Sequence, residues 1–226
     1  MNGELDEAKR IVETFIKNVP KVFDGKKCIL WMKSNNSEHW RKMEWAGHFF
    51  EEFGVKQLTS NLGGKRGPKY GNTEFDFMKN FVWDIKMHSE CTSPWTILND
   101  KEAIERCVKE RTGLGYIIGI GKMIYDQDGS FKRWHDKLKG KISDYEKERI
   151  RRGAKSRRRK KKCIFVGLKI LFFKDFENFN EGLKQGWIKE FQKGMRNADG
   201  SPRRPKFMAD IDNVPDEFVI IEEHFK

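Results

Sequence analysis

Two aspartates and a lysine stand close together in one short stretch of the chain: Asp76, Asp84 and Lys86. From Phe81 onward the residues alternate between apolar and other types, which predicts a strand whose successive side chains point to opposite faces. Asp84 and Lys86 are two positions apart, so they share a face. A second short strand is predicted over residues 73–78, and a hairpin between the two would bring Asp76 beside Asp84 and Lys86.

These three residues suit a site for a hard cation. Two carboxylates at one point repel each other unless a cation lies between them, and Mg²⁺ prefers oxygen ligands, with a substrate phosphate completing its coordination. Lys86 would stand next to the metal, where it could orient or deprotonate an attacking water and neutralise charge on the phosphoryl group. The pattern therefore predicts a metal-dependent nuclease site. The alternative is a surface hairpin whose charged face is only solvated.

The composition favours a polyanionic partner. The chain has 226 residues, with 46 Lys and Arg against 34 Asp and Glu, which gives a net charge of +12. An excess of this size suits nucleic acid, although it says nothing about the fold. Hydrophobic content is only 37%, but 18 Phe and 7 Trp supply a large buried area, so we expect a folded protein.

Neither a membrane segment nor a disulfide framework is expected. No apolar run approaches the roughly 18 residues that a membrane-crossing helix needs, and the acidic, polar N-terminus is unlike a signal peptide. We therefore expect a cytoplasmic protein without a membrane partner. The cysteines have no paired spacing typical of metal sites and are expected to be reduced thiols in the core. They are Cys28, Cys91, Cys107 and Cys163.

The hydrophobic spacing predicts the elements that must position the site. A helix is expected over residues 39–53, ended by Gly54, because its apolar residues repeat every three or four positions. Further helices are expected over residues 4–18, 99–112, 131–151 and 179–196, strands over residues 116–125, 163–173 and 217–221, and a short strand or helical turn over residues 28–32.

If the short helix over residues 99–112 is left aside, the order of these elements between residues 37 and 173 is helix, three strands, helix, strand. This order predicts an α/β (α+β) fold with a mixed central sheet. We expect one domain over residues 1–226, with an N-terminal appendage over residues 1–36, a core over residues 37–173, and an extension over residues 174–226 that contacts DNA.

With Asp76 at the end of the first strand and Asp84-Ile85-Lys86 on the second, the chain resembles the PD-(D/E)xK nuclease superfamily, although Phe75 stands where that motif has a proline. The resemblance implies a restriction-endonuclease-like αβββαβ core around a mixed four-stranded sheet. It also implies that Asp76, Asp84 and the carbonyl of Ile85 bind Mg²⁺ and that Lys86 is the catalytic lysine.

Many members of that superfamily add a glutamate from the helix before the first strand. Glu44 is the first candidate and Glu51 the second, and either could instead be a solvated helix residue. Within the superfamily the chain is most similar to a type II restriction endonuclease, which implies hydrolysis of double-stranded DNA at a specific, palindromic site by a homodimer. The alternatives are a repair or junction-resolving nuclease of the same superfamily, and a basic nucleic-acid-binding protein without enzymatic activity.

Ten of the fourteen positions in the range 149–162 are Lys or Arg, and none is acidic. Charge of this density releases counterions from a phosphate backbone, so the run is expected to bind DNA through Arg157, Arg158 and Arg159. The alternative is a solvated helix face.

Two loops and a histidine complete the expected DNA contacts. Prolines stiffen the loop over residues 196–206, which favours base reading, and the glycine-rich loop over residues 63–72 leads into the site. His88, on the Asp84 face, is expected to bind a phosphate or a water. The alternatives are ordinary surface turns and a structural histidine. The expected contact residues are Lys65, Arg66, Lys69, Asn72, His88, Arg203, Arg204 and Lys206.

Overall fold

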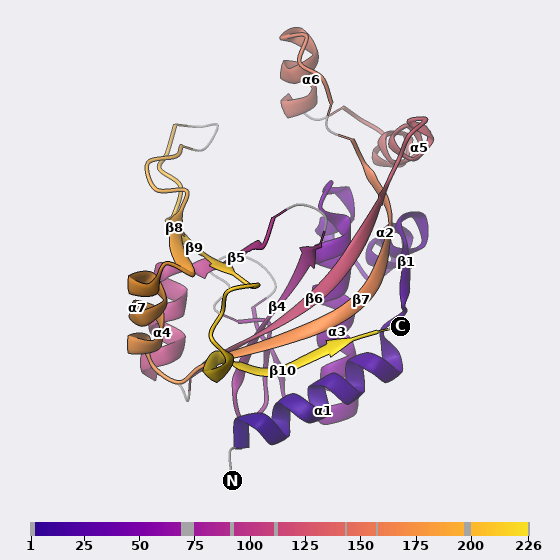
Figure 1. Cartoon of the computed structure of the whole chain (residues 1–226). Coiled ribbons are helices and arrows are strands. Elements are labelled where there is room, and N and C mark those ends of the chain that lie inside the picture. Colours follow the sequence, from indigo (N-terminus) through magenta and orange to yellow (C-terminus); the bar gives the residue numbers. More distant parts are fainter. Residues whose placement is uncertain are drawn as a thin grey trace.

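The computed structural model describes residues 3–68, 75–90, 93–110, 113–142, 144–156, 158–196 and 200–225. Over these residues the chain has a mixed α/β fold, in which a curled sheet carries helices on both faces (Figure 1). The expected α/β class with a mixed central sheet is therefore confirmed.

The large sheet has seven strands among the described residues, in the order β1-β7-β6-β4-β3-β2, with β10 as a second partner along the β1 edge of β7. Strands β4 and β6 run parallel, and every other neighbouring pair is antiparallel. The strands are β1 (Val22–Asp24), β2 (Lys65–Arg66), β3 (Phe77–Met78), β4 (Val82–Ser89), β6 (Leu114–Tyr125), β7 (Lys160–Phe173) and β10 (Val219–His224).

Each face of this sheet has its own core. Helices α1 (Gly3–Asn18), α2 (Gly25–Ser34) and α3 (Trp45–Leu62) cover one face. Helices α4 (Lys101–Glu110) and α7 (Phe176–Gln185) cover the other, together with a three-stranded sheet of β5 (Trp95–Asp100), β9 (Lys206–Asp210) and β8 (Ile188–Phe191). Helices α5 (Ser130–Lys139) and α6 (Asp144–Arg151) lie between β6 and β7 in the chain, beyond the strand ends in Figure 1.

The predicted alternation along β4 is confirmed. Trp83 and Ile85 belong to the core under α1 and α3, whereas Val82 belongs to the core on the opposite face. Asp84 and Lys86 share the side of Val82, so they point away from α1.

The helix expected over residues 39–53 begins later and ends later. Residues Glu38–Arg41 form a 3₁₀ helix, and α3 then runs through Gly54 to Leu62. Gly54 does not stop the helix. Instead, it permits close packing, because a Cβ atom there would lie 2.8 Å from the ring of Phe15 on α1. The helix ends at Gly63, whose φ of 72° lies in the left-handed region.

Other boundaries also differ from the sequence prediction. Gly140 (φ 76°) divides the expected helix over residues 131–151 into α5 and α6. Gly186 (φ 83°) ends α7, so the residues that follow form β8 instead of continuing the expected helix over residues 179–196. The segment 28–32 is helical, and residues 95–100 are a strand before α4 begins. The last strand runs from Val219 to His224.

Helix α1, expected as part of an N-terminal appendage, contributes to the main core through Ala8, Ile11 and Phe15, which are fully buried. Three of the four cysteines fall in described residues and are buried free thiols, as predicted: Cys28, Cys107 and Cys163. The fourth, Cys91, lies outside the described residues. Within the described residues, every helix is too short or too polar to cross a membrane.

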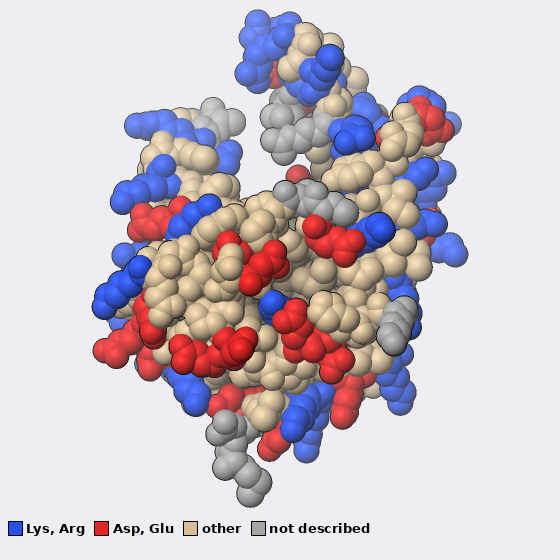
Figure 2. Space-filling view, viewed as in Figure 1, with Lys and Arg blue, Asp and Glu red and all other residues tan. Residues whose placement is uncertain are grey.

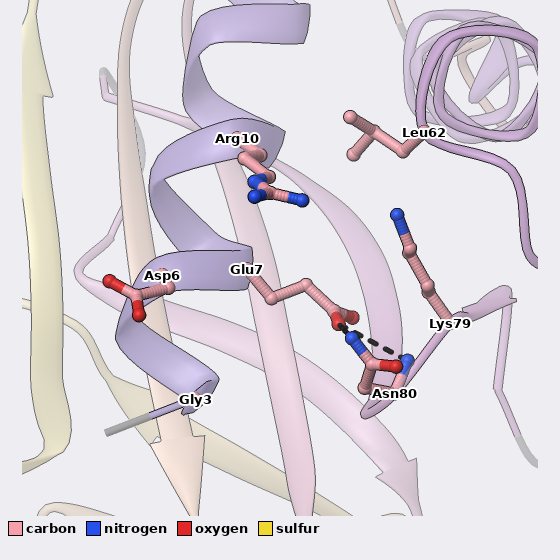
Figure 3. Close-up of a pocket in the computed structure, with 7 residues that line it drawn as sticks. All are labelled: Gly3, Asp6, Glu7, Arg10, Leu62, Lys79 and Asn80. Atoms are coloured by element: carbon pink, nitrogen blue, oxygen red, sulfur yellow. Dashed lines mark hydrogen bonds between the residues drawn. The ribbon is translucent and has the colours of Figure 1, made fainter. Parts of the chain in front are cut away.

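Glu7 of α1 anchors the turn of the β3–β4 hairpin (Figure 3). Its buried carboxylate accepts hydrogen bonds from Asn80 N (3.1 Å), Asn80 Nδ2 (2.8 Å), Phe81 N (3.4 Å) and the indole Nε1 of Trp83 (2.8 Å). One side chain thus satisfies four donors that the hairpin presents. A buried carboxylate is costly unless it is fully hydrogen-bonded. Burial of Glu7 is therefore favourable only when the hairpin supplies these four donors.

We expect Glu7→Ala to lower the free energy of unfolding by about 2–4 kcal/mol, because it leaves buried donors without an acceptor. At about 2–4 °C per kcal/mol for a chain of this size, the melting temperature should fall by at least 4 °C. Asp6→Ala is the matched control, since Asp6 is the exposed neighbour in the same pocket, and should change stability by less than about 0.5 kcal/mol. Equal effects of the two variants in urea unfolding would show that Glu7 does not anchor the turn.

Candidate functional site

The β3–β4 hairpin brings Asp76 against the strand that carries Asp84, as predicted. The two strands pair with Phe77 opposite Trp83, and the backbone of Asp76 donates to the carbonyl of Trp83 (3.0 Å). The side chain of Asp76 accepts a hydrogen bond from Ile85 N (2.7 Å). Asp76 is therefore fixed at both its backbone and its carboxylate.

Asp84 is buried, with 2% of its surface exposed, and both of its oxygens are engaged. Asn99 Nδ2 on β5 donates to Oδ1 (3.0 Å), and the ammonium of Lys86 forms an ion pair with Oδ2. An amide and an ammonium thus hold this carboxylate in one orientation. Asn99 was not among the site residues predicted from the sequence, because no spacing pattern connects it to the hairpin.

Helix α3 packs against β4 and contributes Glu51 to the cluster. Burial raises the pKa of Glu51, Lys86 opposes this, and Asp84 and Glu52 raise it further, so that the pKa is about 7. Glu51, the second candidate glutamate, therefore lies within electrostatic reach of the predicted triad.

Glu44, the first candidate, is exposed at the N-cap of α3 and lines a separate pocket with residues of α5 and α6. It precedes Glu51 by two helical turns, about 10 Å along the axis. The sequence pattern placed both glutamates near the edge of the apolar stripe of a helix over residues 39–53. The observed helix starts at Trp45, so Glu44 stands only at its N-cap, whereas Glu51 lies within the helix.

The cluster carries more negative than positive charge when ionised. Burial raises the pKa of Asp76 well above its usual value, and Asp84 and Glu51 raise it further, while Lys86 and the Ile85 N–H oppose them. Burial alone would lower the pKa of Lys86, but Asp84, Asp76 and Glu51 outweigh it and raise this pKa above its usual range. Three carboxyl groups therefore act electrostatically on one ammonium, which stays charged and contacts Asp84.

The donor atoms of this cluster fit a hard divalent cation. Asp76, Asp84 and the backbone carbonyl of Ile85 offer oxygen ligands, and a cation would relieve the repulsion that raises the carboxyl pKa values. Within the ranges described above, no three or more His, Cys, Asp or Glu side chains are grouped closely enough to hold a metal ion by themselves. A cation here would need the carbonyl, water or substrate oxygens to complete its coordination, which is usual for Mg²⁺.

Two further residues surround Asp84. Burial raises the pKa of Tyr116 on β6 well above 10, Asp84 raises it further, and the phenol lies against the backbone of Asn99. Burial lowers the pKa of Lys206 at the start of β9, as does Lys86, while Asp100 and Asp84 oppose the decrease. Lys206, predicted as a DNA contact, therefore lies beside the carboxylate cluster.

His88 lies on the Asp84 face of β4, as predicted, where it contacts the same strand β5 that carries Asn99. It is buried, with 7% exposure, and its Nδ1 is 2.9 Å from the hydroxyl of Thr96. Burial lowers its pKa, Asp212 opposes this decrease and Lys160 adds to it. A neutral, buried imidazole bonded to a hydroxyl is the arrangement that the structural alternative describes, and the contact of His88 with a phosphate or a water stays a prediction.

The predicted basic residues have different environments. Lys65 and Arg66 are exposed on β2, and Arg66 is near enough to lower the pKa of Glu51. Arg158 is exposed with its guanidinium 5.1 Å from the ring centre of Tyr125, whereas Arg159 is buried with 6% exposure. The arginine run is thus not a uniform surface row. Lys69, Asn72 and Arg157 lie outside the described residues.

Four of the basic residues predicted as DNA contacts, Arg158, Arg159, Arg203 and Arg204, lie on two projections of the chain, which we call the hairpin arm and the helical arm. The hairpin arm joins β8 to β9, contains the exposed Arg203 and Arg204, and is closed by a bridge between Arg196 and Pro202. The helical arm consists of α5, α6 and the basic residues that follow. Figure 2 shows a hollow between the arms, with Lys and Arg on both sides.

Comparisons with models of protein families, with curated proteins and with solved structures found no match.

The pKa of Glu51 predicts a measurable pH dependence. Its folded value of about 7 exceeds the ordinary 4.5, so its contribution to stability is present below pH 4.5 and is lost as the pH rises through about 7. In EDTA we therefore expect the melting temperature of the wild type to fall between pH 5 and pH 8, and Glu51→Gln to flatten this fall. Mg²⁺ should raise the melting temperature of the wild type more at pH 8 than at pH 5, because binding requires deprotonated carboxylates.

Glu44→Gln is the matched control on the same helix and should leave the pH profile of thermal unfolding unchanged. A Glu51→Gln profile that superimposes on that of the wild type would exclude Glu51 from the cluster.

Proposed function

We propose that this protein is a Mg²⁺-dependent nuclease that hydrolyses phosphodiester bonds in double-stranded DNA. The observation that carries the proposal is the cluster of the buried Asp76 and Asp84 with the partly buried Glu51, which all act electrostatically on the charged Lys86. A carboxylate cluster of this kind, placed beside basic arms, suits a polyanionic substrate and the cation that accompanies it.

The order of elements around the cluster supports the restriction-endonuclease-like reading. Helix α3, strands β2, β3 and β4, helix α4 and strand β6 follow each other as helix, three strands, helix, strand, with a short strand β5 between β4 and α4. The three strands are antiparallel neighbours, and α4 leads to β6, which lies parallel to β4. In the order predicted from the sequence, the third strand was the segment 116–125 and the last strand was the segment 163–173.

Mg²⁺, held by Asp76, Asp84 and the carbonyl of Ile85, would polarise the phosphate and lower the pKa of a bound water. Lys86 keeps its proton at neutral pH, so we assign it the orientation of the water and the stabilisation of negative charge at the phosphoryl group, and not the role of base. Glu51, with a pKa near 7, suits proton acceptance from the attacking water. The water oxygen would bond to phosphorus while its proton passes to Glu51, the bond between phosphorus and the 3′ oxygen would break, and the 3′ oxygen would leave as a hydroxyl after taking a proton from solvent water.

The substrate would lie in the hollow between the two arms. Lys206 stands at the base of the hairpin arm and within electrostatic reach of Lys86 and Asp84, which connects that arm to the cluster. A single cluster cuts one strand, so cleavage of both strands at a palindromic site would require a C₂ homodimer. Cleavage of both strands at a specific site by such a homodimer is the activity of a type II restriction endonuclease, which we propose for this protein.

The direct test is incubation of supercoiled plasmid with the protein in Mg²⁺ and in EDTA. We expect Mg²⁺-dependent conversion to discrete linear fragments. Cleavage restricted to branched or damaged DNA would favour a repair or junction-resolving nuclease of the same fold. Binding without cleavage in Mg²⁺ or Mn²⁺ would favour a non-enzymatic DNA-binding protein and contradict the proposal.

Arg203 and Arg204 test whether the hairpin arm reads bases. Both are exposed, and Arg203 N donates to the carbonyl of Met195 (2.8 Å), which fixes the backbone of the arm. We expect alanine at either position to weaken binding to cognate DNA by about 1–3 kcal/mol and binding to unrelated DNA much less. Gel shifts in Ca²⁺ measure both affinities. Lys193→Ala, on the same arm, is the control, and equal losses on both DNAs would identify phosphate contacts instead.

A further inference from the structure

A second charged pocket lies between the N-terminal end of α3 and helices α5 and α6. It has a volume of about 410 Å³. The cationic side chains that line it are Arg41, Lys42, Lys132, Lys139, Lys141 and Arg159. Glu44 also lines it, which places the pocket about two helical turns, or 10 Å, from Glu51 along α3.

Arg159 is the distinctive residue of this pocket. It is 94% buried, and its Nε and Nη1 atoms have no hydrogen-bond partner in the described part of the chain. Buried N–H groups of a charged guanidinium are costly without acceptors, because they have lost their hydrogen bonds to water. An anion bound at these two nitrogen atoms would supply the missing acceptors.

Two of the three acidic side chains that line the pocket are paired with cations. Asp136 pairs with Lys132 (2.8 Å) and Lys139 (3.7 Å). Glu146 pairs with Lys132 (3.5 Å) and Arg149 (2.8 Å). The third, Glu44, is exposed, and the six cations that line the pocket outnumber the three carboxylates, so the pocket keeps a net positive charge.

The pocket also has an apolar wall. Ile142 and Ile150 line it while 54% and 55% exposed, and Met43 lies beside them. Exposed isoleucines beside a buried cation suit a ligand that has both an anionic group and a flat apolar body. A nucleotide combines these two features.

We propose that this pocket binds a nucleotide, with the phosphate at Arg159 and the base against Ile142 and Ile150. The nucleotide is either free or the 5′-phosphorylated end of a strand, and the chemistry recognised is the same. The proposal does not rest on the nuclease function, because binding here requires neither Asp84 nor a metal.

The test is calorimetric titration in EDTA with a 5′-mononucleotide, with the matching nucleoside and with inorganic phosphate. We expect the mononucleotide to bind at least tenfold more tightly than the nucleoside, and inorganic phosphate to compete with it. Arg159→Met, which keeps the side-chain bulk and removes the charge, should weaken mononucleotide binding at least tenfold. It should also raise the melting temperature of the ligand-free protein by at least about 2 °C, because an unpaired buried charge has been removed. Lys155→Met, at an exposed lysine of the same basic run, should change neither.

Equal affinities for mononucleotide and nucleoside, or an unchanged affinity in Arg159→Met, would overturn the proposal. If Arg159→Met does not fold, the double variant Lys42→Ala, Lys141→Ala replaces it, and an unchanged affinity there has the same meaning. Oligonucleotides with and without a 5′ phosphate separate the two sources. Tighter binding of the phosphorylated oligonucleotide that is lost in Arg159→Met identifies a strand end as the ligand. Equal binding of the two oligonucleotides identifies a free nucleotide. Asp84→Asn should bind the mononucleotide normally, so failure of the nuclease proposal would leave this result intact.

Discussion

Replacing Asp84 by asparagine is expected to lower the rate of DNA cleavage at least about 1000-fold, which corresponds to about 4 kcal/mol of transition-state stabilisation. Asparagine keeps the shape of the side chain and an oxygen for Asn99, but it removes the charge that binds a cation and pairs with Lys86. DNA affinity should stay within about threefold of the wild type, because Asp84 is buried and contributes no positive charge to the arms.

Single-turnover cleavage and gel shifts on the same preparation separate these two effects. Asp128→Asn serves as the control, since Asp128 is an aspartate in the loop before α5, remote in sequence from the hairpin. Cleavage by Asp84→Asn at a tenth of the wild-type rate would remove Asp84 from the proposed metal site.

Replacing Lys86 by methionine is also expected to lower cleavage by at least about 100-fold, because a positioned charge near the phosphoryl group is lost. The variant should show a second change that a merely structural residue would not cause. Lys86 lowers the pKa values of Glu51 and Asp76, so its removal should move the rising limb of the pH–rate profile to higher pH.

Lys86→Arg should not restore the rate, because a planar guanidinium does not reproduce the contact of a compact ammonium with Asp84. Lys122→Ala is the control, since Lys122 is an exposed lysine on the adjacent strand β6. A pH–rate profile that keeps its position after removal of Lys86 would contradict the proposed coupling.

The local part of the candidate site was predictable from the sequence. Alternation over eight residues determines which side chains share a face of β4, and the short turn over residues 79–81 determines that Asp76 returns beside Asp84. Both features depend on residues close together in the chain, so the pattern of types was sufficient. The class of the fold followed similarly from the order of periodic segments.

The remainder required tertiary structure. Asn99 and Lys206 reach the cluster from the second sheet, and no local pattern connects them to Asp84. The order of the two candidate glutamates also needed the structure, because Glu44 and Glu51 both lie near the edge of one apolar stripe, and only Glu51 comes within electrostatic reach of Asp84. The end of the same helix was misplaced, because Gly54 was interpreted as a helix stop, whereas it allows α1 to approach α3. Burial of Arg159 inside a basic run was equally invisible, because charge density does not reveal which cation points inward.

Strand β7 gives this fold a specific folding order. It pairs with β6 on one edge and with both β1 and β10 on the other, so segments near residues 22 and 224 attach to one strand near residue 165. Contacts between residues so distant in sequence form slowly, because long loops must close before the contacts repay the lost entropy. During synthesis, the sheet that carries Asp84 would therefore stay incomplete until the last strand emerges. The emerging chain would expose the edge of β7 for longest, and that edge is the place where we expect misfolded molecules to associate.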